Sequence, residues 1–219
     1  RSVDVQWGNH DIAWMGAACG SEACIANVVR NCIKYRTMST LESGYGVSLR
    51  ALTLFARQTY GGEPMDAALK AIAVIQFKLE GQAILRHPEY GMDDRLLLGK
   101  INGSTVESEG VTYQLNDSFF PTVNPDGPYE LTEGEREVID GLRDSFLNSA
   151  VLRSHITFLY EKGGMYRCCN GNLLYHGCVP LRDDGSFDEV EHFGKRYSGK
   201  AYFDMADSRA RRAFFSRHK

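Results

Sequence analysis

The sequence predicts an α/β protein, because short apolar strands alternate along the chain with much longer helices. At the start, Val3, Val5 and Trp7 recur at period two, the spacing of a strand. From Ile12 to Tyr35, apolar residues recur at intervals of three and four, the spacing of a helix. The full order is strand, three helices, hairpin, helix, strand pair and helix, which is typical of an α/β protein carrying a helical insertion.

The first third of the chain reads as one strand followed by helices. Gly8-Asn9 turns the chain after the first strand. Ser21 is a suitable N-cap, and it divides the following helical stretch into a short piece and a longer helix. Periodic apolar residues predict a second helix over Leu41–Gln58 and a third over Met65–Leu85.

The middle of the chain predicts a hairpin and then a long helix. Residues Lys100–Leu115 are β-branched and punctuated by glycine, a pattern that favours a β-hairpin. Thr132 and Glu135 have the spacing of a capping box, in which each residue hydrogen-bonds the other's backbone at a helix start. We therefore expect one helix from Glu133 to about Lys162.

The last part of the chain predicts two strands and a final helix. The strands flank an Asn-Gly turn at Asn170-Gly171, and the helix covers Ala201–His218. The predicted arrangement has core segments at about 1–39 and 130–219, with a mainly helical insertion at about 40–129.

Composition narrows the class of protein. Of the 219 residues, 43% are hydrophobic and 24% charged, as in globular proteins, and the net charge is −3. This charge gives no strong attraction to nucleic acid or to a membrane surface, and no apolar run is long enough to span a bilayer. The basic residues near Arg209–Lys219 read as the solvated face of a helix. The six cysteines lack zinc-site spacing, so we expect reduced, buried or half-buried thiols in a cytoplasmic protein.

Two strand ends carry the candidate chemistry. The first is QWGNHD, where Asn9 offers a hard, neutral oxygen ligand for Mn²⁺ or Mg²⁺. His10 can deliver a proton to a leaving oxygen, and Asp11 can either orient that ring or cap the following helix. Taken alone, a histidine at a strand end is also compatible with a purely structural role.

The second strand end is LLYHGCVP. Here His176 is a candidate imidazole ligand, and Gly177 lets the backbone pass close to a bound group. Ligands gather at the carboxyl ends of strands in α/β folds, so we expect His176 to face the same cleft as Asn9.

Gly-Asn-His-Asp followed much later by strand-His-Gly-x-x-Pro resembles the calcineurin-like metallophosphoesterases. The segments QWGNHDIAWMGAACGSEACIANVVR, RSHITFLYEKGGMY, NLLYHGCVPL and FGKRYSGKAYFD narrow this likeness to class III fructose-1,6-bisphosphatase, the Firmicutes type. The resemblance implies a partial metallophosphoesterase β-sandwich flanked by helices. It also implies Mn²⁺-dependent hydrolysis of fructose 1,6-bisphosphate in gluconeogenesis, with Asn9 and His176 as metal ligands and His10 as the acid.

The chain departs from the family pattern in two places. The family's Asp-x-His and Gly-Asp-x-x-Asp-Arg-Gly segments, which supply most ligands of the first metal, have no counterpart here. No later Gly-His element follows His176, since His192 and His218 lack the preceding glycine. We therefore expect an internal fragment that carries about half of a two-metal Mn²⁺ site and is inactive alone. A homo-oligomer is compatible with the sequence.

Other interpretations stay open. A different phosphate ester is an alternative substrate, and a non-catalytic fragment is an alternative of another class. His155, with Arg153, either binds a sugar phosphate or lies on a helix surface. Lys195, Arg196 and Lys200 either meet a second phosphate or are exposed loop charges.

Overall fold

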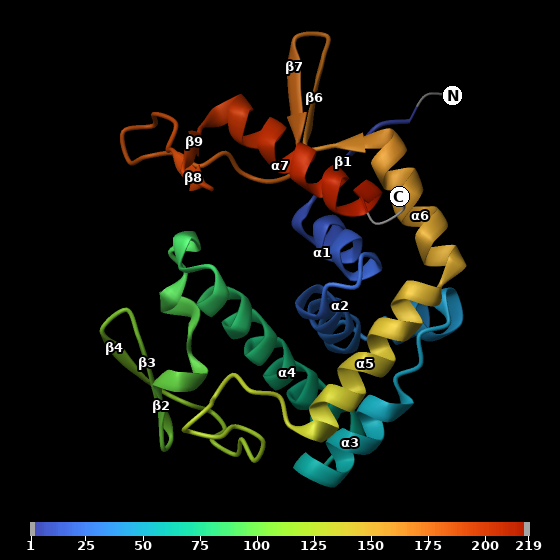
Figure 1. Ribbon diagram of the computed structural model, residues 1–219, viewed down its shortest axis with the longest axis vertical. Helices are drawn as coiled ribbons and strands as arrows, with labels where there is room; N and C mark the ends of the chain where they lie inside the picture. Colours follow the sequence, from blue (N-terminus) through green and yellow to red (C-terminus); the bar gives the residue numbers. More distant parts are fainter. Residues whose placement is uncertain (1–2, 217–219) are drawn as a thin grey trace.

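The computed structural model describes residues 3–216. Its α-helices are α1 (Asn9–Ala18), α2 (Glu22–Lys34), α3 (Arg50–Tyr60), α4 (Pro64–Arg86), α5 (Glu133–Asn148), α6 (Ala150–Lys162) and α7 (Gly199–Phe215). Its shorter helical turns are the π-helix η1 (Thr40–Gly44) and the 3₁₀ turns η2 (Pro88–Tyr90), η3 (Asp93–Arg95) and η4 (Leu98–Lys100). The predicted α/β class is confirmed (Figure 1).

The strands of residues 3–216 form four small sheets. They are β1 (Val5–Gln6) with β5 (Gly163–Gly164), β2 (Ile101–Asn102) with β3 (Thr105–Ser108) and β4 (Val111–Gln114), β6 (Tyr166–Cys169) with β7 (Asn172–Tyr175), and β8 (Val190–His192) with β9 (Lys195–Tyr197). Only the β1–β5 pair is parallel, with Val5 opposite Gly163. Helices α1, α6 and α7 lie around this pair (Figure 1). The predicted partial β-sandwich stays a prediction.

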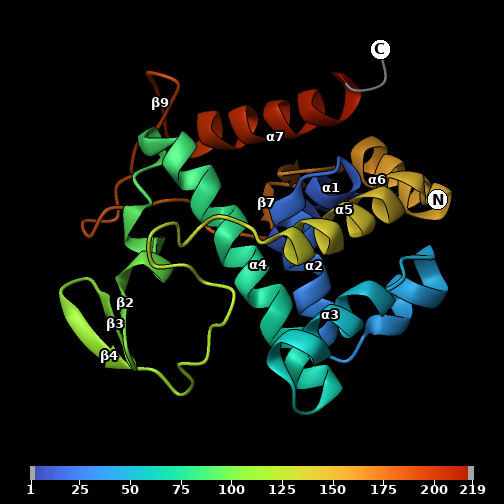
Figure 2. The ribbon, with the colours of Figure 1, turned by 60° about the horizontal axis from the view of Figure 1, so that its bottom comes forward.

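The hydrophobic core lies among the helices. The α2 helix packs against α1, α4 and α5, and α3 packs against α4 and α5 (Figure 2). Their facing side chains are fully buried, among them Ile25, Val29, Ile72, Ile75 and Ile139. Apolar burial of this kind contributes roughly 1.5–3 kcal/mol per large side chain, so the helical body supplies most of the stabilisation available to the chain.

Several predicted elements are confirmed. The α4 helix covers the predicted Met65–Leu85 stretch and begins at Pro64, which is favourable at a first helical position because it needs no N–H partner. The capping box is present: Glu135 N–H donates to Thr132 Oγ1 at 3.3 Å, and Thr132 N–H donates to Glu135 Oε2 at 2.8 Å. The turn at Asn170-Gly171 joins β6 to β7.

The single helix predicted over Glu133–Lys162 was wrong, because the chain bends at Ser149 between α5 and α6. Ser149 has extended backbone and caps α6, accepting the Leu152 N–H at 3.3 Å. Its hydroxyl also donates to the carbonyl of Tyr45 at 2.7 Å. This bend lets α5 follow the helical body while α6 runs toward the β1–β5 pair (Figure 1).

The helix predicted over Leu41–Gln58 was also wrong in its first half. The chain forms the π-helical turn η1 and then a bend, and α3 begins only at Arg50. Gly46 has a φ of +72°, a left-handed conformation that breaks a helix and suits glycine. The predicted hairpin over Lys100–Leu115 has an additional short strand, β2. The part of the predicted last helix beyond residue 216 lies outside the described residues.

A buried ion pair connects α4 to α5 inside the helical body. Lys78 Nζ lies 2.7 Å from Glu135 Oε2, and both side chains are fully buried. Lys78 also donates to the carbonyl of Thr122 at 2.6 Å. The predicted insertion contains α3 and α4, and their buried residues belong to the same hydrophobic core as those of α2 and α5. The predicted boundaries of the insertion, near residues 40 and 129, stay a prediction.

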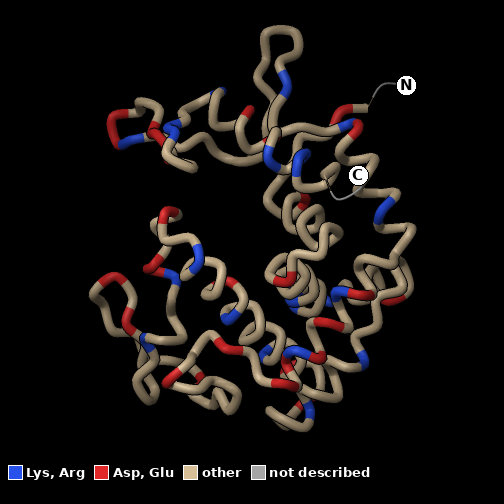
Figure 3. The backbone as a smooth tube through the Cα atoms, in the orientation of Figure 1, with Lys and Arg blue, Asp and Glu red and all other residues tan. Residues whose placement is uncertain are grey.

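Charges of both signs are spread over the chain rather than gathered on one face (Figure 3). Among the residues that the structure describes, no helix is long and apolar enough to cross a membrane. None of the six cysteines, all of which lie within residues 3–216, forms a disulfide. Cys32 is buried, whereas Cys168, Cys169 and Cys178 are exposed, so the expectation of buried or half-buried thiols was wrong for these three.

Candidate active site

The first corner is anchored by Trp7, which is 2% exposed. Its backbone N–H donates to the Gly164 carbonyl at 2.9 Å, and its indole Nε1 donates to the Leu159 carbonyl at 3.0 Å. A Cβ at Gly163 would lie 2.1 Å from the same Nε1, so only glycine fits beside the indole. These contacts fix the point at which β1 ends and α1 begins.

Arg211 of α7 also contacts this corner. Its guanidinium lies 4.8 Å from the Trp7 ring, a cation–π distance. It also donates to the Gly163 carbonyl at 2.7 Å and pairs with Asp207. Arg211 therefore points inward, unlike the solvated basic face predicted for this helix. Arg217 and Lys219, which belong to the same prediction, lie outside the described residues.

Gly8 and Asp11 start α1. The Asp11 carboxylate accepts the Gly8 N–H at 2.8 Å, and the Gly8 carbonyl accepts the Ile12 N–H at 3.1 Å. A carboxylate in the first turn also interacts favourably with the helix dipole. Of the two roles left open for Asp11, the structure supports the capping role. Asn9 and His10 follow Gly8 on this first turn, and both are exposed.

The second corner follows β7. Asn170 and Gly171 have φ angles of +50° and +75°, which suits the tight turn between β6 and β7 and sets their register. The hairpin projects from the body (Figure 1), and His176 follows directly after its second strand.

The two corners meet at Gly8. A Cβ on Gly8 would lie 2.7 Å from both Cδ2 and Nε2 of His176, so the imidazole packs directly on the glycine backbone. The structure thus brings His176 against the residue that precedes Asn9 and His10. The convergence expected from the sequence is present, while the chemical roles of the three residues stay predictions.

These donors suit part of a divalent metal site. An amide oxygen from Asn9 and an imidazole nitrogen from His176 are ligand types that Mn²⁺ accepts. Among the residues that the structure describes, no group of three or more His, Cys, Asp or Glu side chains is placed to hold an ion. The pair therefore fits as a portion of a metal centre and not as a complete one.

The other charged candidates have local partners. Arg153 donates to the Leu147 carbonyl at 2.9 Å, away from His155. Arg196 lies 3.2 Å from Glu189. A hydrogen bond to Asp204 raises the pKa of Lys200. The Arg153–His155 combination for a sugar phosphate is thus not assembled, and Arg196 and Lys200 each pair with an acidic neighbour.

Sequence reasoning missed two features of this region. Gly8 was interpreted as a turn residue, whereas it is the surface on which His176 packs. The signal available was a glycine directly before Asn-His, but its long-range partner depends on the tertiary fold. The second is a cavity beside α1 whose lining includes Trp14 and Tyr45, two residues that were not among the candidates.

Known proteins are similar to this chain over its whole length. The profile described as Firmicute fructose-1,6-bisphosphatase matches residues 1–219. The chain is 52% identical over 237 residues to fructose-1,6-bisphosphatase class 3 of Clostridium novyi (strain NT), covering 98% of this chain and 36% of that protein. It is 50% identical over 242 residues to a class 3 protein of Clostridium beijerinckii, covering 100% of this chain and 36% of that one.

A third relative, fructose-1,6-bisphosphatase class 3 of Alkaliphilus metalliredigens (strain QYMF), is 46% identical over 243 residues. No solved structure gives a significant match. Within the α/β fold, two strand ends converge on Gly8. The chain belongs to the Firmicute fructose-1,6-bisphosphatase family. It spans about a third of the length of the curated relatives it matches, 36% in each case.

Proposed function

We propose that this chain is part of a metal-dependent phosphatase that hydrolyses fructose 1,6-bisphosphate to fructose 6-phosphate and phosphate, a reaction of gluconeogenesis. The observation that supports this is the packing of His176 on Gly8, because it places an imidazole beside Asn9 and His10. The names of the relatives supply the substrate.

Asn9 and His176 would hold Mn²⁺, in a two-metal centre whose remaining ligands come from outside these residues. A bound metal pair supplies an activated water and neutralises charge on the phosphate. The first-turn N–H groups of α1 have no partner within the helix, and they add partial positive charge that favours the phosphate oxygens.

His10 would act on the leaving group. Its imidazole is exposed at the second position of α1, one residue from Asn9, so it can reach a group held at this corner. A protonated ring there would donate its proton to the ester oxygen as that oxygen leaves the phosphorus. The Asp11 carboxylate is occupied by the Gly8 N–H, so it fixes the turn.

The two alternatives make different predictions. A phosphatase for another phosphate ester would use the same corner with a different specificity, and a non-catalytic chain would show no turnover even within a complete protein. We also place the protein in the cytoplasm, supported by its six cysteines, none of which forms a disulfide in the described residues.

The test is phosphate release from fructose 1,6-bisphosphate by the complete enzyme containing this chain, assayed with and without Mn²⁺. We expect Mn²⁺-dependent release that Asn9→Ala and His176→Ala abolish. Near-normal release by either variant would exclude that residue as a ligand. No release by the unmodified enzyme, with turnover of another phosphate ester, would support the first alternative.

A further inference from the structure

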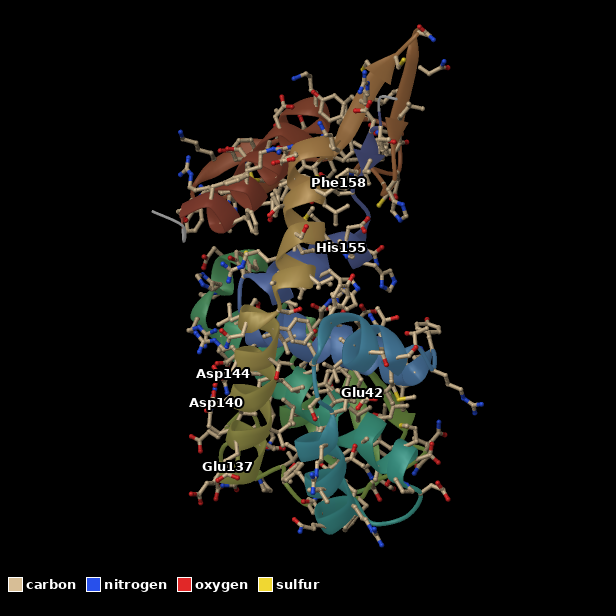
Figure 4. All side chains as sticks on the ribbon, turned by 90° about the vertical axis from the view of Figure 1, so that its right-hand side faces the viewer. Glu42, Glu137, Asp140, Asp144, His155 and Phe158 are labelled. Atoms are coloured by element: carbon tan, nitrogen blue, oxygen red, sulfur yellow. The ribbon has the colours of Figure 1, made fainter. Side chains whose placement is uncertain are left out.

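A cavity of about 330 Å³ lies where α1, α6 and η1 meet. That volume is within the range of small-ligand sites, about 300–1,000 Å³. Its apolar lining includes Leu152 and Ile156, which are almost fully buried, together with the rings of Trp14 and Phe158. Figure 4 shows His155 and Phe158 on the same face of α6. π-helical turns such as η1 are rare and are frequently found at functional sites.

The polar groups of this cavity are hydrogen-bonding rather than cationic. They are the Asp11 carboxylate, the hydroxyls of Thr40 and Tyr45, and the His155 imidazole. Tyr45 and His155 form a hydrogen bond of 3.2 Å between the hydroxyl and Nδ1. Burial raises the pKa of Tyr45, so its hydroxyl stays protonated at neutral pH.

The aromatic rings form a connected wall. The ring centroids of Trp14 and Tyr45 are 5.4 Å apart, and those of Tyr45 and His155 are 5.7 Å apart, both edge to face. Such pairs restrict one another's movement. A wall of rings beside convergent hydroxyl, imidazole and carboxylate groups suits a neutral hydroxylated ring, whose C–H face packs on the aromatics while its hydroxyls are hydrogen-bonded.

No lysine or arginine within residues 3–216 lines this cavity, and Arg153 on α6 donates to the Leu147 carbonyl. A phosphate group would meet the Asp11 carboxylate without a compensating cation. The cavity is therefore unsuited to a phosphoryl group and suited to the uncharged portion of a ligand.

The cavity is linked to the candidate metal corner through Asp11. The Asp11 carboxylate lines the cavity and accepts the Gly8 N–H at 2.8 Å, and the His176 ring packs on the same glycine. A ligand whose phosphate is held beside Asn9 and His176 would thus have this cavity next to its organic part.

We infer that the cavity between α1, α6 and η1 receives the sugar ring of the phosphorylated substrate, with His155 and Tyr45 hydrogen-bonding its hydroxyls and Phe158 packing on its face. This inference rests on the proposed function, and it assigns to that site the residues that distinguish a sugar phosphate from other phosphate esters.

The experiment compares two substrates in the complete enzyme containing this chain. Fructose 1,6-bisphosphate has the sugar ring, and p-nitrophenyl phosphate offers the same phosphoryl group without it. Phe158 is 45% exposed, so Phe158→Ala removes the ring with little effect on the core, and His155→Ala removes one hydrogen-bonding group. The matched control is Val151→Ala, because Val151 is 52% exposed on the same helix and does not line the cavity.

We expect either pocket variant to raise the KM for fructose 1,6-bisphosphate about three- to tenfold, the effect of losing one hydrogen bond or an equivalent contact. The KM for p-nitrophenyl phosphate and the kinetics of Val151→Ala should not change. An unchanged KM for the sugar bisphosphate, or an equal rise for both substrates, would overturn the inference while leaving the proposed function intact. If the proposed function were wrong, the unmodified enzyme would hydrolyse p-nitrophenyl phosphate but not fructose 1,6-bisphosphate. That result would also overturn the inference.

Discussion

The imidazole of His176 packs on Gly8 so closely that a Cβ there would lie 2.7 Å from the ring. Gly8 has φ −96° and ψ 175°, an extended conformation that any residue adopts. Replacing it with alanine therefore creates no backbone strain, and its effect must come through the displaced ring.

Gly8→Ala should accordingly weaken Mn²⁺ binding. A change in the orientation of a metal ligand typically lowers metal affinity about 10- to 100-fold. The change in affinity can be measured as the Mn²⁺ concentration that gives half-maximal activity of the complete enzyme. Gly141→Ala is the control, since a Cβ at this exposed position of α5 contacts nothing within 4 Å. An unaltered Mn²⁺ dependence of Gly8→Ala would show that His176 is no ligand.

His10→Gln should affect substrates according to their leaving group. A sugar alkoxide needs a proton as it leaves, so loss of the acid should lower kcat for fructose 1,6-bisphosphate by about 10²–10⁴-fold. p-Nitrophenolate is a good leaving group and should be released with a much smaller decrease. Equal decreases for both substrates would argue against an acid role for His10.

Lys78→Met should strongly destabilise the fold. It leaves Glu135 buried without its cation, and breaking a buried pair in this way costs about 3–5 kcal/mol. Urea unfolding measures the change. Lys200→Met is the matched control, because Lys200 and Asp204 form an exposed pair that should contribute little. Comparable decreases in the free energy of unfolding of the two variants would mean that burial of the Lys78–Glu135 pair does not account for its contribution to stability.

The 219-residue chain on its own should show no phosphatase activity and only weak Mn²⁺ binding. Two donors, Asn9 and His176, are too few for a metal pair, and the described residues offer no group of three. Isothermal titration with Mn²⁺ and a phosphate-release assay test both parts. Efficient turnover by this chain would require ligands that the proposal does not include.

Local signals in the sequence predicted most of the elements correctly. The capping box at Thr132 and Glu135, the proline start of α4 and the Asn-Gly turn at Asn170 each depend on residues a few positions apart. The break at Ser149 was missed because apolar periodicity continues through it. Ser149 leaves the helical conformation, caps α6 and donates a hydrogen bond to the distant Tyr45 carbonyl. Apolar periodicity cannot predict this hydrogen bond, because its acceptor is far away in the sequence.

The sequence indicated which residues are candidates for the site, but not the contacts that bring their segments together. Asn9, His10 and His176 were recognisable at two strand ends, and the resemblance joined them. Neither the Gly8–His176 contact nor the Trp14–Tyr45 wall follows from spacing, because both join segments that are far apart in the chain. Asp11 had two reasonable roles, and only the geometry of the Gly8 N–H favours one of them.

The contacts around Trp7 also bear on the order in which the protein folds. Helix α4 packs against α3, its neighbour in sequence, and against α2, and these contacts span fewer residues than the 152 between Trp7 and Leu159, which favours their earlier formation. Trp7 instead depends on Leu159, Gly164 and Arg211, which are synthesised after it because synthesis proceeds from the N-terminus. A nascent chain therefore completes its helical body first, and the candidate corner becomes rigid only when α7 has been made and Arg211 has packed against the indole.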